Sequence, residues 1–126
     1  MLIRHDCEPW ERYVEYKNGR MIMPNYDVTL NIHYSLPDEY WKKLNSVYKT
    51  MPFWIGYING IPYWYGDDSN DKTISASVEP GGLQITAILD EDEWNEWYAL
   101  LKKRVSDELG FEVGEPAEGY HFYTTT

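Results

Sequence analysis

The segment Phe53-Trp-Ile-Gly-Tyr-Ile-Asn-Gly-Ile-Pro-Tyr-Trp-Tyr65 places aromatic and β-branched residues on either side of Asn59-Gly60. Such residues favour strands, and an Asn-Gly pair accepts the positive φ that a two-residue hairpin turn requires. The segment therefore predicts a β-hairpin with strands over Phe53–Ile58 and Ile61–Tyr65.

A second hairpin is predicted immediately downstream. Strands over Thr73–Val78 and Leu83–Leu89 flank Glu79-Pro80-Gly81-Gly82, where proline fixes φ and glycine supplies a positive φ.

Upstream of the central hairpin, the sequence predicts three more strands. Tyr13–Tyr16 and Arg20–Met23 flank Asn18-Gly19, another turn of the Asn-Gly type. Alternation of apolar and polar residues then predicts a strand over Tyr26–Tyr34.

The first helix is predicted from about Pro37 to Thr50. Ser35 and Asp38 have the spacing of capping residues, and Pro37 suits a first turn because its missing N–H needs no partner there. Pro52 ends the helix. Its apolar stripe consists of Tyr40, Trp41, Leu44, Val47, Tyr48 and Met51.

The second helix is predicted from near Glu91 to Gly110. Asp90 is the expected N-cap with Glu93 three residues later, and Gly110 is a typical C-terminal stop. Phe111–Val113 and Tyr120–Phe122 are expected to be short extended segments. The core stripe of this helix consists of Trp94, Trp97, Tyr98, Leu101, Val105 and Leu109.

This order of elements predicts an α+β fold: an antiparallel sheet of hairpin-linked strands with two helices packed on one face. The chain has 126 residues and neither an internal repeat nor a linker-like segment, so residues 1–126 are expected to form one domain.

Composition narrows the possible partners and the compartment. A net charge of −10 disfavours binding to nucleic acid or to an anionic membrane. The single Cys7 cannot form an intramolecular disulfide, and Met1–Asp6 contains no apolar signal segment. The uncharged run Thr50–Gly66 is 17 residues long and is interrupted by prolines and glycines. We therefore expect a soluble, cytoplasmic protein.

Catalytic and metal-binding signatures are weak. The potential metal ligands His5, Asp6, Cys7 and Glu8 are consecutive, and their side chains therefore point in different directions. The sequence has no nucleophile elbow and no phosphate-binding glycine loop. The expectation is a protein that is not an enzyme and that holds no metal or cofactor.

The distribution of charge is the most informative feature of the sequence. Residues 67–126 contain four basic and 14 acidic residues, which account for the whole net charge. Helix capping and the helix dipole explain only some of these carboxylates. The remainder serve either solubility or the electrostatic attraction of a basic partner, and charge alone does not decide between these two explanations.

The second half of the chain resembles the small immunity proteins of bacterial polymorphic-toxin and contact-dependent growth-inhibition systems. The resemblance covers residues 53–122 and lies in the hairpin Phe53–Gly66, the turn Glu79–Gly82, the helix with an acidic start and the tail Gly110–Phe122. It implies a non-enzymatic inhibitor of a toxin domain, often a nuclease. Carboxylates can occupy the cationic site that such a nuclease offers to phosphate.

Two functions follow as hypotheses. The preferred one is an immunity protein that binds its toxin through an acidic surface, with Leu100 as an apolar anchor. The alternative is a carbohydrate-binding module or small glycan-active protein that uses Trp54, Trp64 and the neighbouring aspartates, although cross-strand packing also explains these aromatic residues. A subunit of a housekeeping assembly remains a third possibility, and the oligomeric state stays open. The candidate partner-binding residues are Asp67, Asp68, Asp71, Glu91, Asp92, Glu96 and Leu100.

Overall fold

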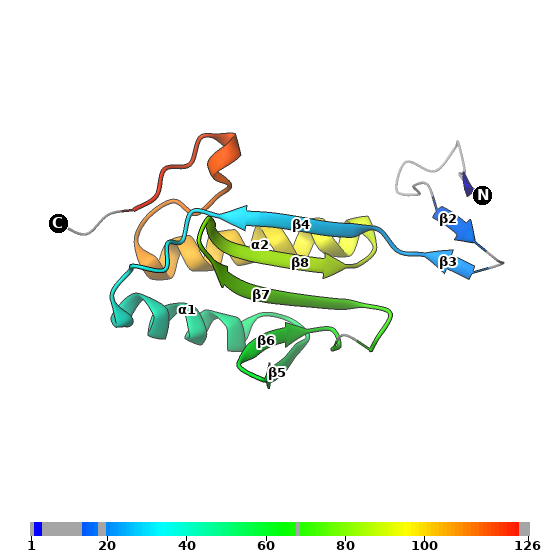
Figure 1. The fold of residues 1–126 in the computed structure, drawn as a ribbon, viewed down its shortest axis with the longest axis horizontal. Coiled ribbons are helices and arrows are strands. Elements are labelled where there is room, and N and C mark those ends of the chain that lie inside the picture. The colour runs from blue at the N-terminus through cyan, green and yellow to red at the C-terminus, as the bar shows by residue number, and fades with distance from the viewer. Residues whose placement is uncertain (1, 4–13, 18–19, 68, 124–126) are drawn as a thin grey trace.

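The computed structural model describes residues 2–3, 14–17, 20–67 and 69–123 and has two antiparallel sheets and two long helices (Figure 1). The larger sheet has five strands in the order β4-β8-β7-β6-β5, and the smaller sheet has the order β1-β2-β3. The elements are β1 (Leu2–Ile3), β2 (Val14–Lys17), β3 (Arg20–Ile22), β4 (Asn25–Leu30), α1 (Asp38–Thr50), β5 (Trp54–Ile58), β6 (Ile61–Trp64), β7 (Thr73–Glu79), β8 (Gly82–Ile88), α2 (Glu91–Leu109) and the short 3-10 helix η1 (Pro116–Glu118).

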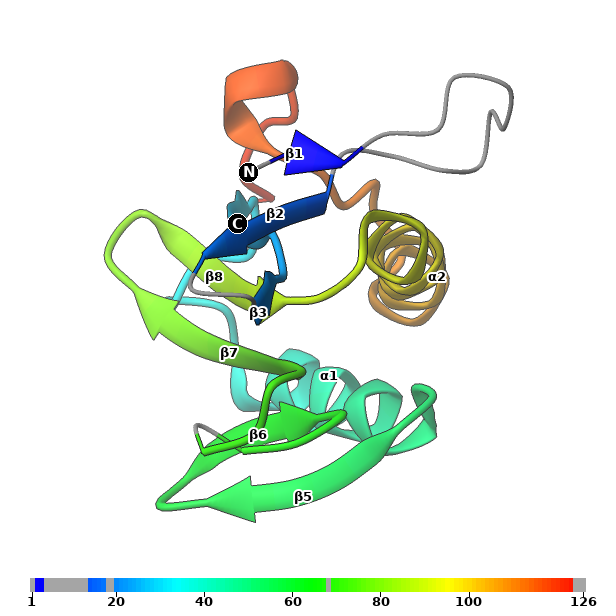
Figure 2. The ribbon, with the colours of Figure 1, turned by 90° about the vertical axis from the view of Figure 1, so that its right-hand side faces the viewer.

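The larger sheet and its two helices confirm the predicted α+β class. Strands β5 to β8 form a meander, and β4 pairs with β8 on the far side of it. Both helices contribute to a single hydrophobic core on one face of this sheet (Figure 2). Neither helix in the described part of the chain has an apolar stretch long enough to cross a bilayer.

The turns form where the sequence predicts them. Asn59 and Gly60 have φ values of 53° and 80°, as a two-residue hairpin requires. Pro80 and Gly81 separate β7 from β8, and Glu79 pairs with Gly82. A Cβ atom on Gly82 would lie 2.2 Å from the carbonyl oxygen of Leu30, so glycine is needed where β4 approaches β8.

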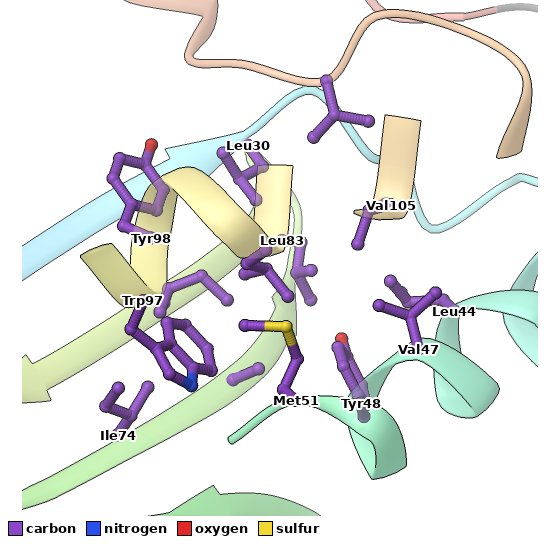
Figure 3. Packing of buried hydrophobic residues seen from close by; sticks show 14 of the residues in the cluster. Leu30, Leu44, Val47, Tyr48, Met51, Ile74, Leu83, Trp97, Tyr98 and Val105 are labelled. Atoms are coloured by element: carbon purple, nitrogen blue, oxygen red, sulfur yellow. The ribbon is translucent and has the colours of Figure 1, made fainter. Parts of the chain in front are cut away.

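The core lies between the sheet and the helices (Figure 3). The predicted stripe of α2 is confirmed, because all six of its residues are buried. In α1, Leu44, Val47, Tyr48 and the following Met51 are buried, whereas Tyr40 and Trp41 are partly buried at its edge.

Strand β4 is shorter than predicted because the chain after Leu30 bonds to the tail. The buried Asn31 donates from its backbone N–H to the Gly114 carbonyl at 2.9 Å, and its Oδ1 accepts from the Gly114 N–H at 2.9 Å. Its Nδ2 donates to the carbonyl oxygens of Glu112 and His121 at 2.9 and 2.8 Å. The tail therefore bonds to Asn31 and does not extend the sheet, and no strand follows α2 in the described residues.

The two helix starts differ. Asp90 caps α2 as predicted and accepts a hydrogen bond from the Asp92 N–H at 2.9 Å. The predicted capping of α1 is wrong: Pro37 occupies the N-cap, and no side chain caps this helix. The Ser35 hydroxyl lies 2.7 Å from Nδ1 of His33 instead. Gly110 ends α2 in the left-handed conformation, as predicted.

Replacing Asn31 with alanine tests the link between β4 and the tail. The Asn31→Ala variant leaves two carbonyl groups and one N–H without their partner, so we expect its free energy of unfolding to fall by about 2–4 kcal/mol. Urea unfolding measures this change, and Asn95→Ala, at an exposed position of α2, is the control. A loss below about 1 kcal/mol would mean that water replaces these hydrogen bonds.

Stability should also depend on pH through Tyr48. Burial raises the pKa of Tyr48 well above its usual value of 10.0. Above pH 10.0 the Tyr48 hydroxyl loses its proton in the unfolded chain but keeps it in the folded chain. The free energy of unfolding therefore falls by about 1.4 kcal/mol per pH unit because of this residue alone. We expect Tyr48→Phe to flatten the decline between pH 10 and 11 in urea melts, whereas Asn95→Ala, which removes no ionisable group, should not.

Candidate functional site

A cavity of about 260 Å³ opens between the start of the edge strand β5 and the first half of α2. Five of its residues present aromatic or aliphatic groups, and two present carboxylates. We call this cavity the edge pocket. Its lining residues are Pro52, Phe53, Tyr65, Glu93, Glu96, Trp97 and Leu100.

Two aromatic residues at the mouth of the edge pocket have an unusual backbone conformation. Phe53 and Tyr65 have φ values of 67° and 70°, a region that costs a bulky residue about 1–2 kcal/mol. Their rings stack with centroids 4.2 Å apart, and the Tyr65 N–H donates to the Phe53 carbonyl at 2.8 Å. Phe53 nevertheless remains 60% exposed, so its burial does not offset this strain.

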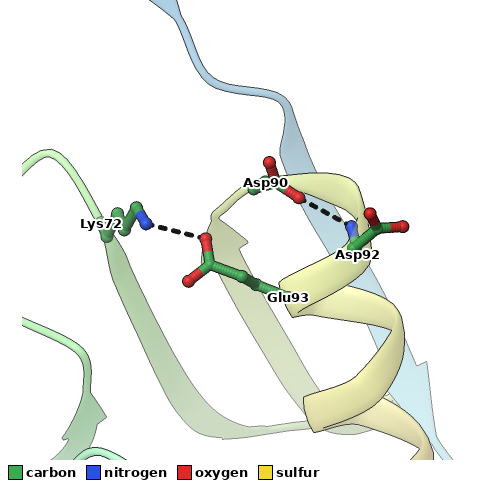
Figure 4. Close-up of polar contacts among 4 residues, drawn as sticks. All are labelled: Lys72, Asp90, Asp92 and Glu93. Atoms are coloured by element: carbon green, nitrogen blue, oxygen red, sulfur yellow. Dashed lines mark hydrogen bonds and ion pairs between the residues drawn. The ribbon is translucent and has the colours of Figure 1, made fainter. Parts of the chain in front are cut away.

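The two carboxylates of the edge pocket affect the ionisation of Tyr65. Burial, followed by the negative charges of Glu93 and Glu96, raises the pKa of the Tyr65 hydroxyl. Glu93 pairs with Lys72 at 2.8 Å (Figure 4). Glu96 is exposed and has no cation within 4.0 Å among the residues that the structure describes. The pocket therefore combines aromatic faces with one carboxylate that is not neutralised locally.

The acidic loop before β7 lies next to the acidic start of α2, because Lys72 in this loop reaches Glu93. Within the loop, Asp67 accepts hydrogen bonds from the Ser69 hydroxyl and N–H at 2.6 and 2.8 Å, which lower the pKa of its carboxyl. Asp71 is exposed. The structure thus brings together two clusters that are about 20 residues apart in sequence.

The remaining predicted residues occupy different positions around this site. Glu91 and Asp92 are exposed in the first turn of α2, and Leu100 is half-buried in the edge pocket. Asp68 lies outside the described residues. The Lys72–Glu93 ion pair connects the loop carboxylates to the helix carboxylates, and we call this set the acidic face: Asp67, Asp71, Glu91, Asp92, Glu93 and Glu96.

Five of the seven residues that line the edge pocket are not among the predicted site residues: Pro52, Phe53, Tyr65, Glu93 and Trp97. Phe53 and Tyr65 were attributed to strand ends, and no pattern in the sequence indicates their positive φ. Glu93 was attributed to helix capping, whereas its carboxylate pairs with Lys72. The available signal was the crowding of aromatic residues in the hairpin, which does not show which rings are exposed.

The sequence also drew attention to four consecutive potential metal ligands and to the two tryptophans of the central hairpin. His5, Asp6, Cys7 and Glu8 lie outside the described residues. Trp54 and Trp64 do not form a flat platform for a sugar, because their planes are inclined at 59° and Trp64 is fully buried. Their contact is cross-strand packing, as in many antiparallel sheets.

Replacing Phe53 with glycine tests whether this residue contributes to the stability of the fold. Glycine relieves the positive φ but loses the ring stack with Tyr65, so we expect the free energy of unfolding to change by less than about 1 kcal/mol. Leu101→Ala, in the core, should lose about 2–5 kcal/mol in the same urea melts. A loss above about 2 kcal/mol for Phe53→Gly would identify Phe53 as a structural residue.

Comparison of the chain with protein-family models, with curated proteins and with solved structures gave no match.

Proposed function

We propose that this chain is an immunity protein that binds and neutralises a basic toxin domain through the acidic face. The observation that supports this most directly is the position of the acidic face beside the edge pocket. Glu93 and Glu96 of this face line a cavity with aromatic and aliphatic walls, and the Lys72–Glu93 ion pair connects the acidic loop to them. A partial apolar centre beside a charged surface is typical of protein–protein interfaces.

The charges and the pocket have different roles in this proposal. The acidic face attracts a basic partner over a distance of about one Debye length and increases its association rate. The pocket then holds the complex, because Phe53 and Leu100 offer apolar area that the partner can cover. A nuclease active site suits this surface, since it is built to accept phosphate and is therefore cationic.

Affinity capture followed by a growth assay tests the function. Tagged protein is used to capture partners from the native host, and each partner is identified by mass spectrometry. Its domains are then expressed alone and together with this chain. We expect a basic domain that arrests growth alone and is harmless when this chain is present. A partner that this chain does not neutralise, or no basic partner at all, would contradict the proposal.

Charge-neutral variants test the role of the acidic face. We expect the double variant Asp71→Asn, Glu96→Gln to associate with the captured toxin domain about three- to tenfold more slowly at low ionic strength. The matched control Asp107→Asn, Glu108→Gln changes the same charge at the exposed far end of α2 and should alter the rate less than about twofold. Stopped-flow measurements over a range of salt concentrations compare the two variants.

Equal rates for both double variants would assign the attraction to the overall net charge and would remove the acidic face from the proposal. The difference should disappear in about 0.5 M salt, because ions screen exposed charges at that concentration.

A further inference from the structure

Strand β5 is an edge of the larger sheet that nothing in the described part of the chain covers (Figure 2). It belongs to the uncharged run Thr50–Gly66, so no charged residue lies on it. Ile55, Tyr57 and Ile58 are exposed along it, Ile55 by 52%. Proteins usually protect such edges with charges, prolines or a covering segment, because free edges recruit other strands. The opposite edge strand, β4, has the exposed Asp27.

Pairing with β6 fixes which backbone groups of β5 face outward. Tyr57 lies opposite Pro62, which has no N–H to donate. In an antiparallel pair, bonded and non-bonded positions alternate, so the N–H and C=O of Tyr57 point away from β6. The Tyr57 hydroxyl donates to Oδ1 of Asn45 at 2.6 Å, which anchors this strand to α1. β5 is therefore a fixed strand with a free donor and acceptor at Tyr57.

The edge pocket lies at the start of β5. Phe53 immediately precedes the strand and lines the pocket together with Glu96. From Tyr57 to Phe53 the chain covers at most about 13 Å at the usual strand rise of 3.3 Å per residue, because the register with β6 shifts between Trp54 and Gly56. A strand added antiparallel to β5 would thus end beside aromatic rings and carboxylates, an environment that suits a cationic side chain.

We propose that an extended segment of a basic partner protein pairs antiparallel with β5 and places an arginine, about four residues after the position opposite Tyr57, in the edge pocket. This proposal rests on the proposed function and specifies its binding mode. A second copy of this chain is a less suitable occupant, because each copy has a net charge of −10 and the pocket itself is acidic.

A synthetic peptide tests the binding mode without the natural partner. The probe has seven residues, alternates valine and threonine, and ends in arginine. We expect saturable changes in the amide NMR signals of Ile55 and Tyr57 and in the ring signals of Tyr65, with a dissociation constant of about 1 mM or tighter. Replacing the arginine with neutral citrulline should weaken binding at least about threefold. Moving the arginine to the first position should also weaken it, because an antiparallel strand then places the charge at the wrong end.

Two variants with the same change of charge test the edge in the complex. Ile55→Glu makes the chain more negative, so electrostatic docking alone predicts equal or tighter binding of a basic toxin domain. Strand addition predicts the opposite, a loss of affinity of at least about tenfold, because a charged group then adjoins the paired strand. Val78→Glu makes the same change at an exposed apolar position on β7 and should alter affinity less than about twofold.

The outcomes separate the binding mode from the function. If the peptide gives no saturable change at β5, or if Ile55→Glu binds the toxin domain as tightly as Val78→Glu, strand addition is overturned, even when growth is still protected. A stable dimer that Ile55→Glu dissociates, measured by analytical ultracentrifugation, overturns it in favour of a second copy. A chain that binds the peptide at β5 but protects against no toxin retains the strand-binding edge and loses the immunity role.

Discussion

The indole ring of Trp64 joins the edge hairpin to both helices, and the geometry of the site depends on it. Trp64 is fully buried, and its Nε1 donates to the Tyr48 carbonyl of α1 at 3.0 Å. Its ring also packs edge-on against Trp97 of α2, with centroids 4.9 Å apart. Because Tyr65 is the next residue, this anchor fixes one wall of the edge pocket, while Trp97 lines another. The same contacts that bury the core thus position the exposed surface.

Local and distant interactions were not equally predictable. The hairpin around Asn59-Gly60 and the buried stripe of α2 follow from turn chemistry and periodicity, which act within a few residues. The hydrogen bonds of Asn31 with Glu112 and His121 link residues 81 and 90 positions apart, and no local pattern indicates them. The charge segregation indicated which half of the chain contains the acidic face, but the Lys72–Glu93 ion pair that joins its two parts required the fold.

The apolar part of the site was the hardest to predict because it depends on two backbone conformations that are rare for bulky residues. Phe53 and Tyr65 occupy a backbone region that bulky residues avoid, and their stacked rings lie beside the acidic start of α2. A periodicity argument assigns each ring to one face of a strand and therefore leaves such a pair at the strand ends unexplained. Strained backbone conformations of this kind cluster at active sites, ligand clamps and switch regions.

The bonding of Asn31 to the tail has a consequence for the order of folding during synthesis. The meander β5–β8 and α2 are contiguous in sequence and can assemble as the chain emerges from the ribosome. The partners of Asn31 at Glu112, Gly114 and His121 emerge only later. Until then its amide lacks partners, so a nascent chain that stops short of them leaves this buried position unsatisfied. Packing of the tail against Asn31 is therefore a late step, which follows the assembly of the meander and α2.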